Sequence, residues 1–172
     1  MSVDIALERA DSPDASDLVL ELEAHLASHY PVESRRGFSV ARLVAESVRF
    51  FVLRVDGSPA GCGGILLVEG VGGDDPPYGE VKRMYVRPRF RGGGLGERIL
   101  ERLADEARAH GIAVLRLETG IHQRAAIALY ERVGFRRIPP FGPYTDDPVS
   151  LCYEMRLDAE APAAGSSSPA AP

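Results

Sequence analysis

A glycine-rich segment in the middle of the chain most constrains how this sequence can fold. It separates a predicted strand at residues 78–86 from a predicted helix that starts at Leu95, and it reads Arg91-Gly92-Gly93-Gly94-Leu95-Gly96. Glycines let the backbone approach a ligand closely, and the unpaired N–H groups at a helix start attract an anion. The segment therefore predicts a phosphate-binding turn, and Arg87 and Arg89 lie just before it.

The segment does not match two common nucleotide-binding motifs. A dinucleotide-binding fingerprint would need a further glycine at Glu97 or Ile99, and a P-loop would need Gly-Lys followed by Ser or Thr. The alternative is a glycine loop that only turns the chain. That alternative leaves the three neighbouring arginines without an explanation.

The charge of the chain is unevenly distributed. The whole chain has a net charge of −5, whereas residues 81–137 carry thirteen basic and six acidic side chains, a net charge of +7. A nucleic-acid partner would usually require a basic surface over the whole protein. The distribution therefore predicts a small anionic ligand, bound locally by the middle of the chain.

Strand and helix signals alternate along the chain and predict one α/β domain, of mixed α+β type, around a single sheet. Strands are expected at residues 3–8, 50–55, 60–69, 78–86, 113–118 and 150–157, and helices at residues 12–29, 39–46, 95–111 and 122–132. Residues 159–172 contain only Ala, Pro, Ser, Gly and one Glu, which predicts a disordered tail after a folded domain of residues 1–158.

Three observations predict a cytoplasmic protein. The longest nearly uncharged apolar stretch, residues 61–68, is far shorter than the roughly 20 residues that cross a bilayer. Residues 1–17 show no pattern of a secretory signal. Cys62 and Cys152 lie among small or apolar residues without a zinc-type spacing, so we expect free thiols and no metal site.

Two further stretches extend the glycine-rich motif. The strand before it ends in Met84-Tyr85-Val86-Arg87-Pro88, and a predicted helix after it reads Gln123-Arg124-Ala125-Ala126-Ile127-Ala128-Leu129-Tyr130-Glu131-Arg132-Val133-Gly134-Phe135. Together these stretches resemble the GNAT superfamily of acetyl-CoA-dependent N-acetyltransferases. The family's pyrophosphate motif, Gln/Arg-x-x-Gly-x-Gly/Ala, is complete here. The second motif matches at its Ala, Leu, Tyr, Gly and Phe positions and departs at Gln123, where the family often has Asn.

The resemblance implies a mostly antiparallel mixed sheet that is splayed at the acetyl-CoA site and flanked by helices. It implies acetyl-CoA as the co-substrate and no metal. Backbone groups of Met84, Tyr85 and Val86 would contact the pantetheine arm and the thioester, and Gln123 and Ala126 would lie beside that arm. The pyrophosphate would be held by the backbone amides of Arg91, Gly92, Gly93, Gly94, Leu95 and Gly96.

The resemblance also implies two catalytic residues. Tyr130 would be the general acid that protonates the sulfur of coenzyme A, and the alternative is a buried tyrosine packed on Phe135. Glu80 would be the general base, and the alternative is a surface ion pair with Lys82 or Arg83. Glu118, at the end of the next strand, is the second candidate for the base.

Strand alternation places Glu80, Lys82 and Met84 on one face, unless a bulge intervenes. In the family, the first helices and the loop near the last strand form the acceptor site. Arg35 and Arg36 could bind a substrate carboxylate or lie in solvent. The candidates for the acceptor site are His25, His29, Tyr30, Arg35, Arg36, Phe38 and residues 141–144.

These inferences predict an enzyme that transfers acetyl from acetyl-CoA directly to a primary amine of a small molecule, such as a metabolite, an amino acid or an amine-bearing antibiotic. The alternatives are N-acetylation of proteins or peptides, and a non-catalytic sensor that binds acyl-CoA. We expect no nucleic-acid or membrane partner, and a monomer or a homodimer.

Overall fold

The computed structural model describes residues 1–35, 37–70, 72–145 and 147–157. The expected tail at residues 159–172, and Arg36, lie outside them. In chain order, the elements are β1 (Val3–Glu8), α1 (Pro13–Ala27), η1 (Val32–Ser34), α2 (Val40–Ala45), β2 (Arg49–Val55), β3 (Ser58–Val68), β4 (Tyr78–Val86), η2 (Pro88–Phe90), α3 (Leu95–Ala109), β5 (Val114–Gly120), α4 (Arg124–Val133), β6 (Arg136–Ile138), η3 (Gly142–Tyr144) and β7 (Ser150–Arg156).

Capping residues that the sequence predicts mark several helix boundaries, whereas α3 ends at Ala109 with His110 as its C-cap and not at the expected residue 111. Ser12 caps α1 by accepting a hydrogen bond from the N–H of Ala15 at 3.3 Å, with proline following at the first helical position. Ser39 caps α2 in the same way. Gly134 ends α4 with a φ of 118°, a conformation that glycine adopts without strain. Local chemistry therefore sets these boundaries.

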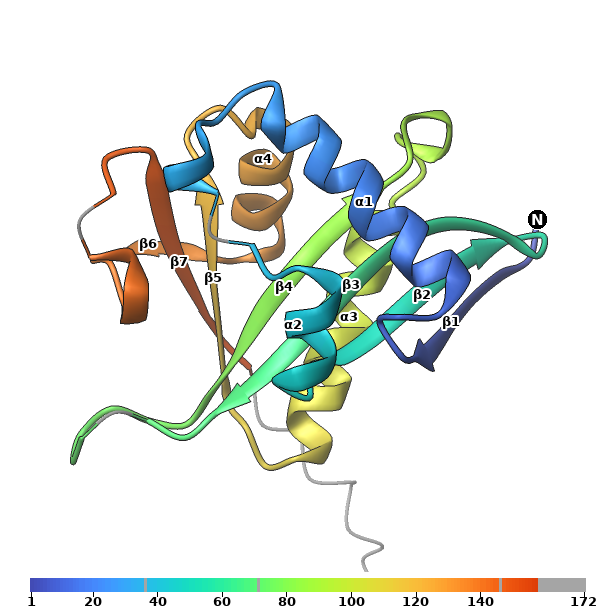
Figure 1. The fold of residues 1–172 in the computed structure, drawn as a ribbon. Helices are drawn as coiled ribbons and strands as arrows, with labels where there is room; N and C mark the ends of the chain where they lie inside the picture. Colours follow the sequence, from blue (N-terminus) through green and yellow to red (C-terminus); the bar gives the residue numbers. More distant parts are fainter. Residues whose placement is uncertain (36, 71, 146, 158–172) are drawn as a thin grey trace, which may run out of the picture.

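The strands form one seven-stranded sheet in the order β1-β2-β3-β4-β5-β7-β6. All neighbouring strands run antiparallel except β4 and β5, which run parallel. One face packs against α3 and α4 through a core that includes Ile99, Leu103 and Tyr130. The other face packs against α1 and α2 through Leu18, Leu43 and residues of the neighbouring strands. Figure 1 shows α1 and α2 in front of the sheet and α3 behind it, so the mixed sheet flanked by helices is confirmed.

A bulge in β4 reverses which face its last residues occupy. Gly64 pairs with Lys82 but Cys62 pairs with Tyr85, so β4 contains one more residue than β3 across this interval. Arg83 takes the strained position with a φ of 55°. The bulge places Met84 in the core on the α3 side, and the expectation from simple alternation that Met84 shares a face with Glu80 and Lys82 is therefore wrong.

The side chain of Arg83 ties this bulge to the helices in front of the sheet. Its Nε donates to the carbonyl of Phe38 at 2.7 Å, and its guanidinium bonds Glu23 of α1 at 2.8 Å. An arginine held in the left-handed region costs about 1–3 kcal/mol, and such strain persists where the surrounding structure enforces it. These bonds provide that enforcement.

Strands β4 and β5 separate soon after they meet. Their pairing consists of Gly79 with Leu115 and Glu80 with Arg116, whereas β5 stays paired with β7 as far as Gly120. Figure 1 shows the two strands diverging toward their C-terminal ends. The splayed sheet that the resemblance implies is present, and the edge of β4 that faces β5 is unpaired beyond this point.

A few features differ from the sequence expectations or extend them. The short strand β6 was not expected, since three residues carry too little periodicity to be recognised. Cys62 and Cys152 are free and buried, as predicted, and burial raises the pKa of the Cys62 thiol to about 12. Within the described residues, no helix has the length and apolar character to cross a membrane.

The chain after α1 is anchored to the turn between β5 and α4. The hydroxyl of Tyr30 accepts a hydrogen bond from the N–H of His122 at 2.9 Å. Its ring lies so close to Gly120 that an added Cβ would overlap it. Because Gly120 has no side chain, the Tyr30 ring can pack against it and hold the segment after α1 against the turn between β5 and α4.

We predict that Gly120→Ala lowers the free energy of unfolding by about 1–3 kcal/mol, because the methyl group must displace the Tyr30 ring. Gly73→Ala is the matched control, since a Cβ there meets nothing within 4 Å, and its effect should stay within about 0.5 kcal/mol. Urea denaturation measures both values. Equal stabilities of the two variants would contradict the close packing of Tyr30 on Gly120.

Candidate active site

A cleft of about 640 Å³ opens between the end of β4, the glycine-rich turn and α4. Most of the predicted cofactor residues line it. Gly93 is the exception, because it is not among the lining residues. The predicted residues that line the cleft are Met84, Tyr85, Val86, Arg91, Gly92, Gly94, Leu95, Gly96, Gln123 and Ala126.

The glycine-rich turn has the conformation that an anion-binding cradle needs. Gly92 and Gly94 have φ values of 87° and 73°, which favour glycine, and Gly94 is the N-cap residue of α3. No side chain in the described residues caps α3, so its first N–H groups remain available for an anion. The Arg91 side chain turns back to donate from Nε to the carbonyl of Val86 at 2.8 Å. The turn therefore fits a pyrophosphate through its backbone.

A second cavity, of about 130 Å³, lies at the point where β4 and β5 diverge. Its lining includes Glu80, Lys82, Glu118 and Tyr144. The two cavities meet, because the same five residues line both. These shared residues are Leu22, Met84, Gln123, Ala126 and Tyr130.

Tyr130 stands at this junction with its hydroxyl unengaged. Its side chain is 6% exposed, and its ring packs against Phe135 with the centroids 5.7 Å apart. Within the described residues, no hydrogen-bond partner contacts the hydroxyl. Burial, and then the charge of Glu118, raise the pKa of Tyr130 above its usual value, so the phenol stays protonated at neutral pH. The packing of Tyr130 on Phe135 is therefore present, and its role as general acid stays a prediction.

Glu80 lies in a buried cluster with Lys82 and Tyr144. The Nζ of Lys82 donates to Oε1 of Glu80 at 2.7 Å and to the hydroxyl of Tyr144 at 2.8 Å, and that hydroxyl donates to the same Oε1 at 2.6 Å. Glu80 and Lys82 are only 5% and 6% exposed. A surface ion pair of Glu80 with Lys82 or Arg83 was the alternative to its role as general base. The structure corrects the location, because the packing of η3 and of Phe38 removes this pair from solvent.

Phe38 and Tyr144 close the cluster from two sides. The Nζ of Lys82 lies 4.2 Å from the centre of the Phe38 ring, at a distance typical of a cation–π contact. Burial, followed by the charge of Glu80, raises the pKa of Tyr144. Tyr144 therefore remains a hydrogen-bond donor to Glu80.

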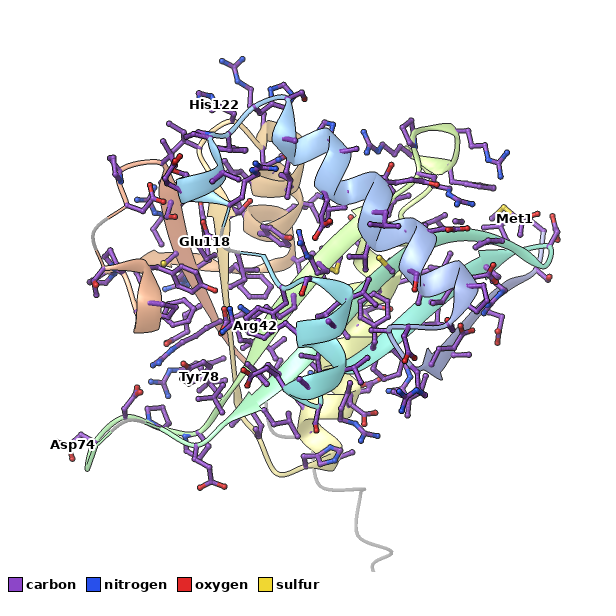
Figure 2. The ribbon with its side chains drawn as sticks, in the orientation of Figure 1. Met1, Arg42, Asp74, Tyr78, Glu118 and His122 are labelled. Atoms are coloured by element: carbon purple, nitrogen blue, oxygen red, sulfur yellow. The ribbon has the colours of Figure 1, made fainter. Side chains whose placement is uncertain are left out.

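Glu118 is the second carboxylate of the smaller cavity. Figure 2 shows it on β5, below the turn that carries His122. Its Oε1 accepts a hydrogen bond from the Ser150 hydroxyl at 2.7 Å. Burial raises the pKa of Glu118, and the Ser150 bond and the charge of Lys82 offset this only in part. Such a carboxylate holds a proton more readily than a solvated one.

The structure divides the predicted acceptor residues between the two cavities. Tyr30, Arg35 and Tyr144 line the smaller cavity. His25 and His29 line the larger cleft instead, with their rings 5.1 Å apart. Phe141 contacts Tyr144 and not the cavity itself. Among the described residues, no cluster of His, Cys, Asp or Glu has the arrangement of a metal site.

Sequence reasoning missed the role of Lys82 as a cavity residue, and it did not place His122 and Arg124 in the larger cleft. A lysine within a strand carries no local signal of burial. The one available indication was its position two residues after Glu80, which places both side chains on the same face of β4.

The sequence profile of the Acetyltransferase (GNAT) family matches residues 14–135. An IAA acetyltransferase from Azospirillum brasilense is 45% identical over 156 residues, which are 91% of this chain and 99% of that protein. The N-alpha-acetyltransferase RimI of Mycobacterium tuberculosis is 31% identical over 91% of this chain and 92% of its own length.

Solved structures share the same architecture. A Klebsiella pneumoniae protein, provisionally described as an acyl-CoA N-acyltransferase, superposes with a TM-score of 0.74 at 34% identity, over 91% of this chain and 98% of that one. PaiA N-acetyltransferase from Thermoplasma acidophilum, solved in complex with coenzyme A, gives a TM-score of 0.70 at 18% identity, over 91% and 100% of the two chains. At that identity the second match shows the fold alone.

We predict that Lys82→Met lowers the free energy of unfolding by about 3 kcal/mol or more, because it leaves Glu80 buried without its cation. The double variant Glu80→Gln with Lys82→Met should lose less than the sum of the two single variants. Urea denaturation of all four proteins gives the coupling energy.

The exposed pair of Arg9 and Asp11 is the control for this cycle. Its atoms approach to 2.8 Å, but the side chains are 71% and 45% exposed. The same cycle with Arg9→Met and Asp11→Asn should give a coupling below about 1 kcal/mol. Additive effects at Glu80 and Lys82 would show that their contact does not contribute to stability.

Proposed function

Because this chain belongs to the GNAT family of acetyltransferases, we propose that it transfers the acetyl group of acetyl-CoA directly to a primary amine of a small molecule. The proposed acceptors are metabolites, amino acids or amine-bearing antibiotics. The observation that carries the proposal is the junction of the two cavities at Tyr130. The larger cleft offers room for the co-substrate, and the smaller cavity offers room for the amine.

Acetyl-CoA, when bound, supplies the activated acetyl group as a thioester. The free N–H groups of the glycine-rich turn and of the first turn of α3 would bind its pyrophosphate. The edge of β4 near Met84 and Val86 is unpaired on the β5 side and would offer backbone groups to the pantetheine arm, the Val86 carbonyl once it is released by Nε of Arg91. Gln123 has a buried Nε2 without a partner in the described residues. That amide donor lines the cleft, and it would serve in place of the more usual Asn.

Tyr130 is proposed as the general acid. The departing sulfur needs a proton, and the Tyr130 hydroxyl is a protonated donor with no competing partner in the described residues. It reaches the junction from α4, on one side of the sheet, through the gap between β4 and β5. Positioning, rather than acidity, carries this role, because burial raises the pKa of the phenol.

We propose Glu118 as the group that receives the proton of the acceptor ammonium. The sequence had favoured Glu80 for this role, with Glu118 as the second candidate. Oε1 of Glu80 already accepts hydrogen bonds from Lys82 and Tyr144. Glu118 has a raised pKa, and its only described hydrogen bond is from Ser150. A base with a raised pKa takes a proton from an amine more readily. Glu80 would then position Lys82 and Tyr144 around the acceptor.

Acetylation of protein N-termini is the second candidate function. It is favoured by the 31% identity to the N-alpha-acetyltransferase RimI of Mycobacterium tuberculosis. The IAA acetyltransferase is more similar, at 45% identity, and the smaller cavity, at about 130 Å³, has little room beyond an amine and a short substituent. These observations support a small acceptor.

Both buried cysteines are free, which supports the further proposal that the enzyme acts in the reducing cytoplasm.

A screen of primary amines and N-terminal peptides, read by release of the free thiol of coenzyme A, tests the proposed function. Small amines should release thiol, and peptides should release little. Turnover of peptides without turnover of small amines would replace the proposal with protein N-acetylation. Tight binding of acetyl-CoA without thiol release from any amine would indicate a non-catalytic sensor.

We predict that Tyr130→Phe lowers kcat by about 100-fold or more, while the Kd for acetyl-CoA changes little, because only the proton donor is lost. Tyr153→Phe is the matched control, since Tyr153 is also buried but its hydroxyl donates to Glu131 outside both cavities. Steady-state kinetics and calorimetry give the two quantities. A near-normal kcat in Tyr130→Phe would remove the proposed role.

We predict that kcat/KM falls as the pH drops through the raised pKa of Glu118, because the protonated carboxyl cannot accept a further proton. Glu118→Gln should remove this acidic limb and lower kcat by about 100-fold. Glu80→Gln should keep the limb. Loss of the limb in Glu80→Gln and its retention in Glu118→Gln would assign the base to Glu80 instead.

A further inference from the structure

The charged side chains that line the smaller cavity do not all pair with one another. They are Arg35, Glu80, Lys82, Arg83 and Glu118. Lys82 pairs with Glu80 at 2.7 Å, and Arg83 pairs with Glu23 of α1 at 2.8 Å. Among the described residues, neither Arg35 nor Glu118 forms a salt bridge, and the charge of Lys82 acts on Glu118 only from a longer distance. The cavity therefore presents one unpaired cation and one unpaired anion.

Arg35 follows η1 and faces this cavity with a donor that nothing satisfies. Its Nε is buried and has no hydrogen-bond partner in the described part of the chain. The one other buried side-chain donor without a partner there is Nε2 of Gln123, which lines the same cavity. A buried donor without a partner costs about 1–3 kcal/mol. The Nε of Arg35 lies at the proposed acceptor site, where a ligand with acceptor oxygens would bond it, whereas Nε2 of Gln123 lines both cavities and is the donor proposed for the pantetheine arm.

We propose that the acceptor carries a carboxylate close to its amine, as amino acids do, and that Arg35 binds this carboxylate. The inference rests on the proposed function and specifies the substrate class of that site. The planar guanidinium matches a carboxylate through two parallel N–H donors. The ammonium group of the same molecule would lie against Glu118, which takes its proton, and beside Tyr130. An amino acid complements both unpaired charges of the cavity.

The same charges discriminate against a peptide N-terminus. In a peptide, the carboxyl group beside the α-amine is an amide and carries no charge, so the half-buried Arg35, with its buried Nε, would lack a counter-charge. A simple amine lacking the carboxylate would leave the same group unpaired. A site built around such a group rejects ligands that leave it unsatisfied.

The test compares glycine, L-alanine and L-serine, whose short side chains suit the smaller cavity, with their primary amides and with the corresponding amines that lack the carboxylate. Thiol release with acetyl-CoA gives kcat/KM for each. In the wild-type protein, the amino acids should exceed both analogues by about 10-fold or more. Arg35→Gln should lower that ratio by about 10-fold, mainly through KM, and Arg35→Lys should restore part of it. Arg9→Gln, a substitution of an exposed arginine, should leave the ratio unchanged.

Equal kcat/KM for amino acids and their uncharged analogues would overturn this inference and leave the proposed function standing. A ratio that survives in Arg35→Gln would also overturn it. If no amine releases thiol, the proposed function fails. Calorimetry of the same ligands, with protein saturated with coenzyme A, then tests the binding of the carboxylate by Arg35 separately. Tighter binding of the amino acids would support it, and equal or absent binding would overturn it.

Discussion

The early separation of β4 from β5 is the constraint on which the site depends. Backbone groups along an unpaired strand edge are costly unless water or a ligand satisfies them. Here the separation begins after Glu80 pairs with Arg116, and the cavity at this point is lined by Leu22 of α1 on one face of the sheet and by Tyr130 of α4 on the other. Tyr130 lines that cavity from α4 and Glu118 lines it from β5, so the proposed proton donor and the proposed proton acceptor converge where neither element alone could place both.

The bulge at Arg83 determines which residues of β4 line each of the two cavities. It keeps Glu80 and Lys82 in the smaller cavity while turning Met84 toward α3, so β4 contributes to both cavities. The bonds from Arg83 to Glu23 and Phe38 hold the first helices over the same cavity. Internal pairing then neutralises most of the buried charge. Arg35 and Glu118, which form no salt bridge among the described residues, line the smaller cavity that we propose as the acceptor site.

Much of the fold follows from local signals that a single sequence contains. The caps at Ser12 and Ser39 and the glycine at Gly134 set helix ends because each acts within one turn of backbone. The face occupied by Met84 could not be predicted, since one inserted residue reverses a strand and no residue type requires the insertion. The burial of Glu80 and Lys82 could not be predicted either, because η3 and Phe38, which cover them, are distant in sequence.

Contiguous motifs in the sequence were enough to identify the family and to locate the proposed phosphate cradle before α3 and the candidate acid Tyr130, because such residues act on their own backbone or on a ligand. Which glutamate and which arginine lack a salt bridge among the described residues depended on the tertiary structure. Those properties depend on pairing between segments far apart in the chain. The sequence shows that a residue is charged, but only the packing of distant segments determines whether an oppositely charged residue lies beside it.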